Sequence, residues 1–118
     1  MSLTLAPIAA TKPTGKDLRR HPRFDCGPYT FSLFQVERDM PLELAGVRNV
    51  SQSGIALITK RPVEPGTLVT VNLFNARRNI AFRVVMRVVY AKPQDDGLYC
   101  VGGSFTDEIS QEEVQWLV

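Results

Sequence analysis

The sequence has few of the residues on which most catalytic and metal-binding sites depend. Its 118 residues include one histidine, His21, and two cysteines, Cys26 and Cys100. His21 has no second ligand residue at metal-site spacing, and Ser51 and Ser53 have no visible His or Asp partner that would activate a nucleophile. Two distant cysteines do not form a disulfide framework, so we expect reduced thiols. The sequence therefore predicts neither an enzyme nor a bound metal or cofactor.

Long apolar runs are also missing. No uncharged apolar stretch is long enough to span a bilayer, and residues 1–10 lack the basic lead and hydrophobic run of a signal peptide. The apolar and charged shares, 44% and 22%, are typical of a soluble globular protein. Residues 1–15 are rich in Ala, Thr and Pro without periodicity. We therefore expect one cytoplasmic domain over residues 16–118, without a membrane span, after a flexible lead over residues 1–15.

Short alternating segments separated by turn residues make up most of the chain. They predict strands over residues 29–33, 42–48, 55–59, 68–74, 80–91 and 98–105. Gly and Pro, or Asn and Asp, supply the turns between several of them. Ser110-Gln111-Glu112-Glu113 fits a capping box, so a short helix should follow it. This order predicts an all-β fold, a six-stranded antiparallel β-barrel with a short C-terminal α-helix.

Four aromatic residues occupy apolar positions of the predicted strands or their ends: Tyr29, Phe31, Phe82 and Tyr90. We expect these side chains to face the core. A protein that binds single-stranded nucleic acid would instead expose aromatic rings interleaved with Lys and Arg along a sheet face. The pattern therefore disfavours that function. Trp116 is expected to pack the terminal helix against the barrel.

Positive charge is concentrated in a basic segment before the first of these strands, Arg19-Arg20-His21-Pro22-Arg23. Its three guanidinium groups repel one another unless solvent or an anion intervenes. An arginine fork pairs bidentately with phosphate or with O6 and N7 of guanine, and its flat face stacks on a purine. Taken alone, the segment is more typical of a solvated basic tail. His21 is expected to face solvent.

A second polar segment runs from Asn49 to Gly54 between two predicted strands. Asn49 and Ser51 alternate, so an extended backbone would point both side chains to one face, where they could bind a base edge or a sugar-phosphate oxygen. Gly54 would permit a positive φ or the close approach of a ligand to the backbone. An ordinary hairpin connection uses the same residue types, and taken alone the segment is more typical of such a connection.

Taken together, the two segments resemble the PilZ domain family. The resemblance rests on Arg-x-x-x-Arg at Arg19 and Arg23, on [Asp/Asn]-x-Ser-x-x-Gly at Asn49, Ser51 and Gly54, and on the strand Val101-Gly102-Gly103-Ser104-Phe105. It covers residues 18–118. It implies a bacterial PilZ-type six-stranded antiparallel barrel that binds cyclic di-GMP.

The resemblance also implies a role for each matching residue. Arg19 and Arg23 would clamp the phosphates and a guanine, with Arg20 assisting. Asn49, Ser51 and Gly54 would form the opposing surface for the other guanine. Asn49 stands where many family members have Asp, and the missing charge would weaken the grip on the guanine N1 and N2 donors.

The family's usual switch is an ordering of the arm. The basic arm would be loose without ligand, would fold over the bound nucleotide, and would change a surface for an unknown effector protein or a fused domain. Two alternatives remain open. One is a small β-barrel that binds single-stranded nucleic acid, although no nucleic acid is expected. The other is a ligand-silent PilZ-like adaptor, against which the intact motif residues count.

Overall fold

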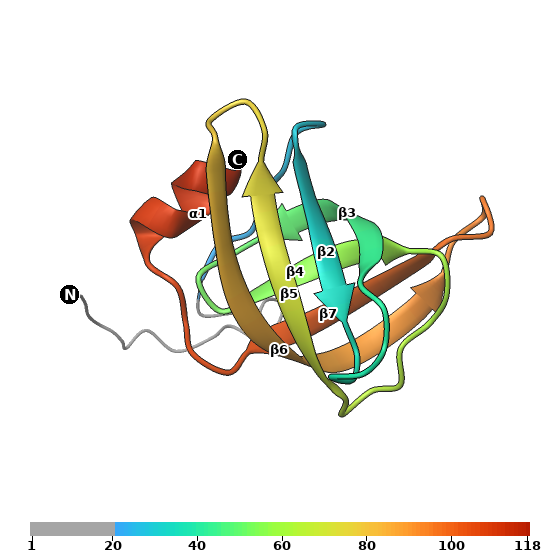
Figure 1. Ribbon diagram of the computed structural model, residues 1–118. Coiled ribbons are helices and arrows are strands. Elements are labelled where there is room, and N and C mark those ends of the chain that lie inside the picture. Colours follow the sequence, from blue (N-terminus) through green and yellow to red (C-terminus); the bar gives the residue numbers. More distant parts are fainter. Residues whose placement is uncertain (1–20) are drawn as a thin grey trace, which may run out of the picture.

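The computed structural model describes residues 21–118, so Arg19 and Arg20 lie outside the described residues. Within that range the elements are β1 (Phe24–Asp25), β2 (Thr30–Gln35), β3 (Glu43–Val50), β4 (Gly54–Thr59), β5 (Leu68–Asn75), β6 (Ile80–Pro93), β7 (Tyr99–Phe105) and α1 (Gln111–Leu117). Strands β2 to β7 close into a barrel in the order β2–β3–β4–β7–β6–β5, and all neighbouring pairs are antiparallel (Figure 1). The predicted six-stranded barrel with a C-terminal helix is confirmed.

The barrel interior is filled by alternate residues of each strand. On β4, Ile55 and Leu57 are at most 1% exposed, and on β5 Val71 and Leu73 are fully buried. Because successive side chains of a strand point to opposite faces, these residues place their neighbours on the outer surface of the barrel. The alternation fixes which side chains point outward, and on β4 the outward residues Gly54 and Ala56 are buried as well.

Helix α1 covers one end of the barrel (Figure 1). It begins with the predicted capping box, in which Ser110 Oγ accepts from the Glu113 amide at 3.0 Å and Glu113 Oε1 accepts from the Ser110 amide at 2.8 Å. Phe82 and Trp116 form an edge-to-face pair with ring centroids 5.9 Å apart. The predicted packing of Trp116 against the barrel is therefore confirmed.

The prediction that Tyr29 and Phe31 face the core is wrong. Strand β2 buries Thr30, Ser32 and Phe34 instead, and Phe31 lies on the outside, stacked on Phe74 with ring centroids 5.1 Å apart. The two hydroxyl groups tolerate burial because Thr30 donates to the Leu117 carbonyl and Ser32 donates to the Ala45 carbonyl.

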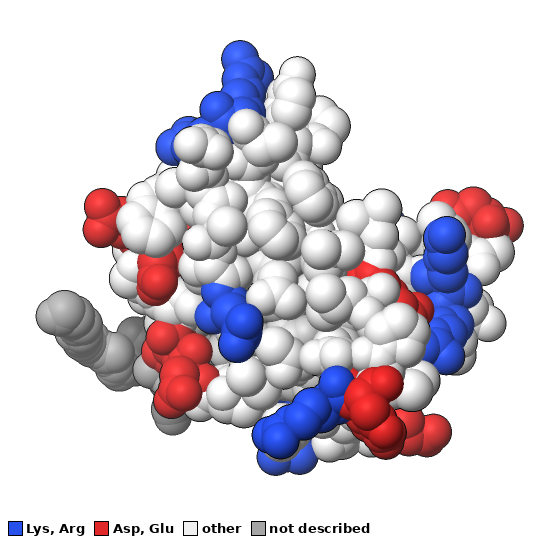
Figure 2. Space-filling view, in the orientation of Figure 1, with Lys and Arg blue, Asp and Glu red and all other residues white. Residues whose placement is uncertain are grey.

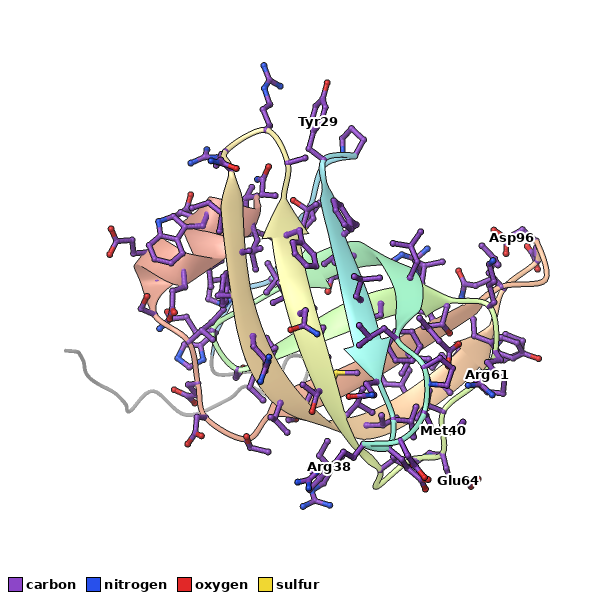
Figure 3. The ribbon with its side chains drawn as sticks, in the orientation of Figure 1. Tyr29, Arg38, Met40, Arg61, Glu64 and Asp96 are labelled. Carbon is purple, nitrogen blue, oxygen red and sulfur yellow. The ribbon has the colours of Figure 1, made fainter. Side chains whose placement is uncertain are left out.

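The outer surface over β2, β5 and β6 therefore carries the pair Phe31 and Phe74 beside polar residues such as Asn72 and Arg83. Figure 2 shows few charged groups across the centre of this face, with Lys or Arg side chains at the tip of the β5–β6 hairpin. Tyr29 is 50% exposed near this tip, and the Arg77 guanidinium lies 5.4 Å from its ring centroid (Figure 3).

The described residues lack two kinds of feature, a membrane-spanning helix and a metal-binding cluster. Among residues 21–118 no helix is long and apolar enough to cross a bilayer. The same residues contain no group of three or more His, Cys, Asp or Glu side chains that could hold a metal ion. Cys26 and Cys100 are both free thiols, the first half-buried and the second buried.

Candidate ligand-binding site

Small residues form a flat area on the outside of β4 and β7, which we call the platform: Gly54, Ala56 and Gly102. Gly54 and Ala56 alternate with the core residues Ile55 and Leu57, so they face away from the barrel interior. Ala56 pairs with Gly102 across the two strands. All three residues are buried, Ala56 at 1% exposure, and the Arg23 guanidinium lies close to Gly54 while the Tyr90 ring lies over Gly102.

Two β-bulges flank the platform. In β3 the extra residue is Arg48, because Val47 and Asn49 pair with the consecutive residues Leu57 and Ala56. In β6 the extra residue is Val89, because Val88 and Tyr90 pair with Gly103 and Gly102. A bulge re-aims the side chains that follow it. Asn49 and Tyr90 each follow a bulge directly.

Both bulges turn a polar or aromatic side chain outward. Val47 and Val88 belong to the core, and regular alternation would place Asn49 and Tyr90 in the core as well. With the extra residues, Asn49, Ala56, Gly102 and Tyr90 form one row across the outside of four adjacent strands. The prediction that Tyr90 faces the core is therefore wrong, and the bulge at Val89 is the reason.

The end of the basic arm is attached to this row. Strand β1 pairs with the end of β3, where Phe24 lies opposite Val50 and Asp25 opposite Asn49. Arg23 precedes β1, and its Nη1 donates a 2.8 Å hydrogen bond to Asn49 Oδ1. The two motif segments predicted from the sequence therefore meet in space at Arg23 and Asn49.

Gly54 is held in place by a close approach of backbone. A Cβ at Gly54 would lie 2.4 Å from the carbonyl oxygen of Gly103 and 3.6 Å from Nη2 of Arg23. A side chain would therefore force β4 and β7 apart, and it would also reach the Arg23 guanidinium. The sequence predicts a positive φ or the close approach of a ligand at Gly54; its φ is not positive, and the close approach in the structure is to the neighbouring strand.

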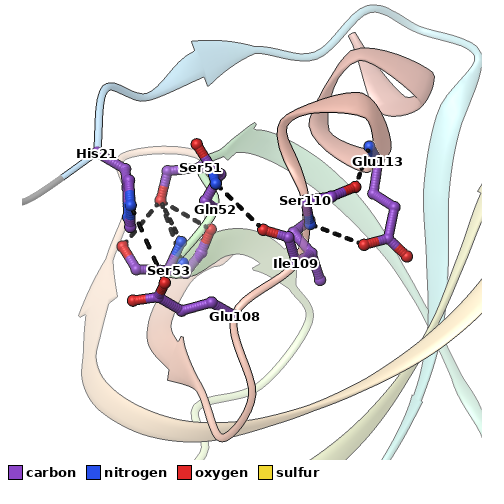
Figure 4. Close-up of polar contacts among 9 residues, drawn as sticks. His21, Ser51, Gln52, Ser53, Glu108, Ile109, Ser110 and Glu113 are labelled. Atoms are coloured by element: carbon purple, nitrogen blue, oxygen red, sulfur yellow. Dashed lines mark hydrogen bonds and ion pairs between the residues drawn. The ribbon is translucent and has the colours of Figure 1, made fainter. Parts of the chain in front are cut away.

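Ser51 has a structural role in the β3–β4 loop (Figure 4). Its side chain is 1% exposed, and Oγ accepts from the amides of Ser53 at 3.2 Å and Gly54 at 3.1 Å. The Ser51 amide donates to the Gly54 carbonyl at 2.9 Å. Ser51 thus shapes the loop that positions Gly54, and its hydroxyl does not share the exposed face of Asn49 as alternation had predicted.

The same loop contacts the segment that leads into α1. The Ile109 amide donates to the Gln52 carbonyl at 2.9 Å, and Gln52 Nε2 donates back to the Ile109 carbonyl at 3.4 Å. Next to this connection, His21 Nε2 lies 4.0 Å from a Glu108 carboxylate oxygen (Figure 4). The side chain of His21 is 18% exposed, so this residue is largely covered and does not face solvent as predicted.

Positively charged side chains lie around Tyr90, at the edge of the platform. Burial raises the pKa of the Tyr90 hydroxyl above its usual range and the neighbouring Cys100 thiol adds to this, while the guanidinium groups of Arg23 and Arg48 oppose the shift. The Lys92 ammonium lies 5.0 Å from the centroid of the Tyr90 ring. Three cations from three segments therefore converge on one tyrosine, which suits an anionic, planar ligand.

The structure brings together part of the predicted site. Arg23, Asn49 and Gly54 lie at one place, Ser51 supports them from the loop, and Arg19 and Arg20 lie outside the described residues. Sequence reasoning missed Tyr90 and Gly102. Gly102 could have been noticed as a glycine inside a strand, which often marks a close approach.

The chain is similar to known proteins over the whole barrel. The sequence profile of the PilZ domain family matches residues 17–118, and no curated protein sequence matches the chain. The fold is similar to the PilZ domain of Escherichia coli YcgR solved with c-di-GMP, at 11% identity and a TM-score of 0.66 over 86% of each chain.

Two longer proteins have a similar fold. One is K. pneumonia MrkH in a c-di-GMP complex, with 18% identity and a TM-score of 0.64, where 86% of this chain covers 49% of MrkH. The other is Bacillus subtilis MotI/DgrA, with 16% identity and a TM-score of 0.62, where 90% of this chain covers 52% of that protein. The chain thus spans about half the length of these two proteins. The profile match covers most of the sequence and the barrel has the same architecture, so this chain belongs to the PilZ domain family.

Proposed function

We propose that this domain is a cytoplasmic receptor for cyclic di-GMP, which binds against Arg23, Asn49 and the edge of the platform and is released chemically unchanged. The observation that carries the proposal is the hydrogen bond from Arg23 to Asn49. The bond brings a guanidinium, a group that can bind phosphate, next to an amide that can contact a base edge, beside the small residues Gly54, Ala56 and Gly102.

The chemistry of the ligand matches that of the site. Cyclic di-GMP offers two phosphates and two guanines, and an arginine fork binds either a phosphate or the O6 and N7 edge of guanine. Arg23 is one such fork, and Arg19 and Arg20 precede it in the sequence. MrkH and the PilZ domain of YcgR, whose folds are similar, were solved with this nucleotide.

The arm supplies the switch in this proposal. From His21 onward the arm already lies against the barrel, held by Arg23 and by the pairing of β1 with β3. We propose that residues 16–20 close over the nucleotide when Arg19 and Arg20 pair with it. His21 lies beside Glu108, which precedes α1, so closure would alter the surface around the β7–α1 loop and its affinity for an effector protein or fused domain.

Calorimetric titration with cyclic di-GMP tests the proposal. The wild-type domain should saturate with one or two ligands per protein, and Arg23→Ala should bind at least about tenfold more weakly, because hydrogen bonds to charged groups contribute roughly 1.5–3 kcal/mol. Arg83→Ala is the matched control. Arg83 is an exposed arginine of β6 that bonds to Asn72, outside the platform, so its removal should leave affinity unchanged.

Two results would refute the proposal. One is equal binding by the wild type and Arg23→Ala, and the other is no preference for cyclic di-GMP over GMP. Absence of any nucleotide binding, with the domain folded, would instead support the ligand-silent adaptor.

Binding of single-stranded nucleic acid is a second candidate function, because the prediction that Tyr29 faces the core, which argued against it, is wrong. Tyr29 is exposed and its ring lies beneath Arg77, an arrangement on which a base could stack. Titration of a labelled oligothymidine, followed by fluorescence anisotropy, separates the two functions. Nucleic-acid binding would be weakened by Tyr29→Ala and by salt, whereas binding of cyclic di-GMP would not depend on Tyr29.

A further inference from the structure

We infer that Tyr90 is a base-stacking residue, on which one guanine of the bound nucleotide lies in place of the Lys92 ammonium. The inference rests on the proposed function and extends it to a residue that neither motif contains. It is carried by the position of the ring over Gly102 and by the position of Lys92 over the ring.

The ring of Tyr90 occupies space that a side chain on β7 would otherwise fill. A Cβ at Gly102 would lie 2.3 Å from Cζ of Tyr90, 2.4 Å from Cε2 and 2.5 Å from the hydroxyl oxygen. Gly102 pairs directly with Tyr90 across the two strands. The ring is therefore folded back over the sheet at the edge of the platform, so it does not extend freely into solvent.

The ring is held in position from several sides. The bulge at Val89 turns Tyr90 outward, and the buried Cys100 thiol lies beside its hydroxyl. A ring fixed in this way loses little conformational freedom when a base stacks on it, which favours binding. Tyr29, by contrast, is the exposed tyrosine at the hairpin tip and takes no part in the platform.

Lys92 marks the ring face that a ligand would use. Its ammonium lies 5.0 Å from the ring centroid, within the range of a cation–π contact, and the residue itself is exposed. A guanine stacked on this face would displace the ammonium, and the flexible lysine could then pair with a phosphate of the same nucleotide. Arg23 and Arg48 are close enough to Tyr90 to act on its hydroxyl, so cations already surround the proposed base position.

The test compares Tyr90→Leu, Tyr90→Phe and the wild type for binding of cyclic di-GMP. Base–aromatic stacking is worth roughly 1–3 kcal/mol per base, so Tyr90→Leu should weaken binding by roughly 5- to 150-fold. Tyr90→Phe keeps the ring and should bind within about threefold of the wild type. Proton NMR of the bound nucleotide gives an independent readout, because the ring current of Tyr90 should move one guanine H8 resonance upfield in the wild type and in Tyr90→Phe only.

Tyr29→Leu is the matched control, and it should change neither the affinity nor the H8 shift. Circular dichroism and thermal unfolding establish that each variant is folded, and Tyr90→Phe provides the comparison if Tyr90→Leu is destabilised. Equal affinity and equal H8 shifts in the wild type and a folded Tyr90→Leu would overturn the inference while leaving the proposed function intact. Loss of binding in Tyr90→Phe as well as in Tyr90→Leu would assign the role to the hydroxyl and would also overturn it. A wild type that does not bind the nucleotide would overturn both proposals.

Discussion

Arg23 and Asn49 are joined by a hydrogen bond of 2.8 Å although 26 residues separate them in the sequence. The bond connects the basic arm to strand β3 of the barrel, and the pairing of β1 with β3 reinforces the same connection. Neither residue is fully buried, so both remain accessible to a ligand. The relationship makes the two motif segments one physical unit.

A double-mutant cycle measures the coupling between Arg23 and Asn49. Arg23→Gln and Asn49→Ala should each weaken binding of cyclic di-GMP, and the double variant should lose less than the sum, with a coupling of about 1 kcal/mol. Calorimetry on the four proteins gives the coupling free energy. Strictly additive losses would show that the two side chains act on the ligand independently.

Gly54→Ala should destabilise the barrel by roughly 1–3 kcal/mol, as overpacking usually does. The added methyl group would lie 2.4 Å from the backbone oxygen of Gly103, and backbone cannot move aside as a side chain can. Urea unfolding measures the change. Gly46→Ala is the control, because its methyl group would meet only Ile58 Cβ, at 3.8 Å, which is an ordinary contact. A similar loss in both variants would mean that the close approach to Gly103 is unimportant.

Ser51→Ala should lower the free energy of unfolding by roughly 1–3 kcal/mol, since it leaves the amides of Ser53 and Gly54 without their acceptor. Ser53→Ala removes only a hydroxyl that lies 3.3 Å from Ser51 Oγ, so it should cost less. Denaturant unfolding of both variants makes the comparison. If Ser51→Ala kept full stability but lost ligand affinity, Ser51 would act on the ligand directly.

The Cys26 thiol should react slowly with thiol reagents at pH 8. Burial, and to a smaller extent the charge of Asp25, raise its pKa from 9.0 to about 12, and only the thiolate is nucleophilic. The pKa of Cys26 is higher in the folded than in the unfolded protein. Its contribution to the free energy of unfolding is therefore complete below about pH 9 and is lost as the pH rises towards 12. A Cys100→Ala background isolates Cys26 in a reaction followed from pH 7 to 11. A rate that levels off near pH 9 in the folded protein would contradict this prediction.

Local patterns were sufficient to predict most of the fold. Turn residues delimited the strands, and the capping box at Ser110 needs only residues within one helical turn, so both could be recognised in the sequence. The two-residue strand β1 was missed because so short a segment carries no alternation. It exists through its pairing with β3, a contact that sequence periodicity does not encode.

The failures of the core assignment have two separate causes. In β2, Thr30 and Ser32 occupy the interior because their hydroxyl groups reach backbone carbonyls 87 and 13 residues away, partners that no local pattern reveals. In β6, the alternation that holds up to Val88 is interrupted at Val89, so Tyr90 has the opposite orientation to the one predicted. The candidate site depends on this second effect, and Tyr90 could not be assigned to it from the sequence.

The extra residues Arg48 and Val89 have a consequence for how relatives of this domain are compared. Deleting either one would leave Asn49, Tyr90 and both motifs intact in the sequence, yet it would turn the following side chain into the apolar interior of the barrel. A relative can therefore keep every motif residue and still lack the outward-pointing side chains that correspond to Asn49 and Tyr90. Counting residues between the strands is as informative about ligand recognition as checking which residues are present.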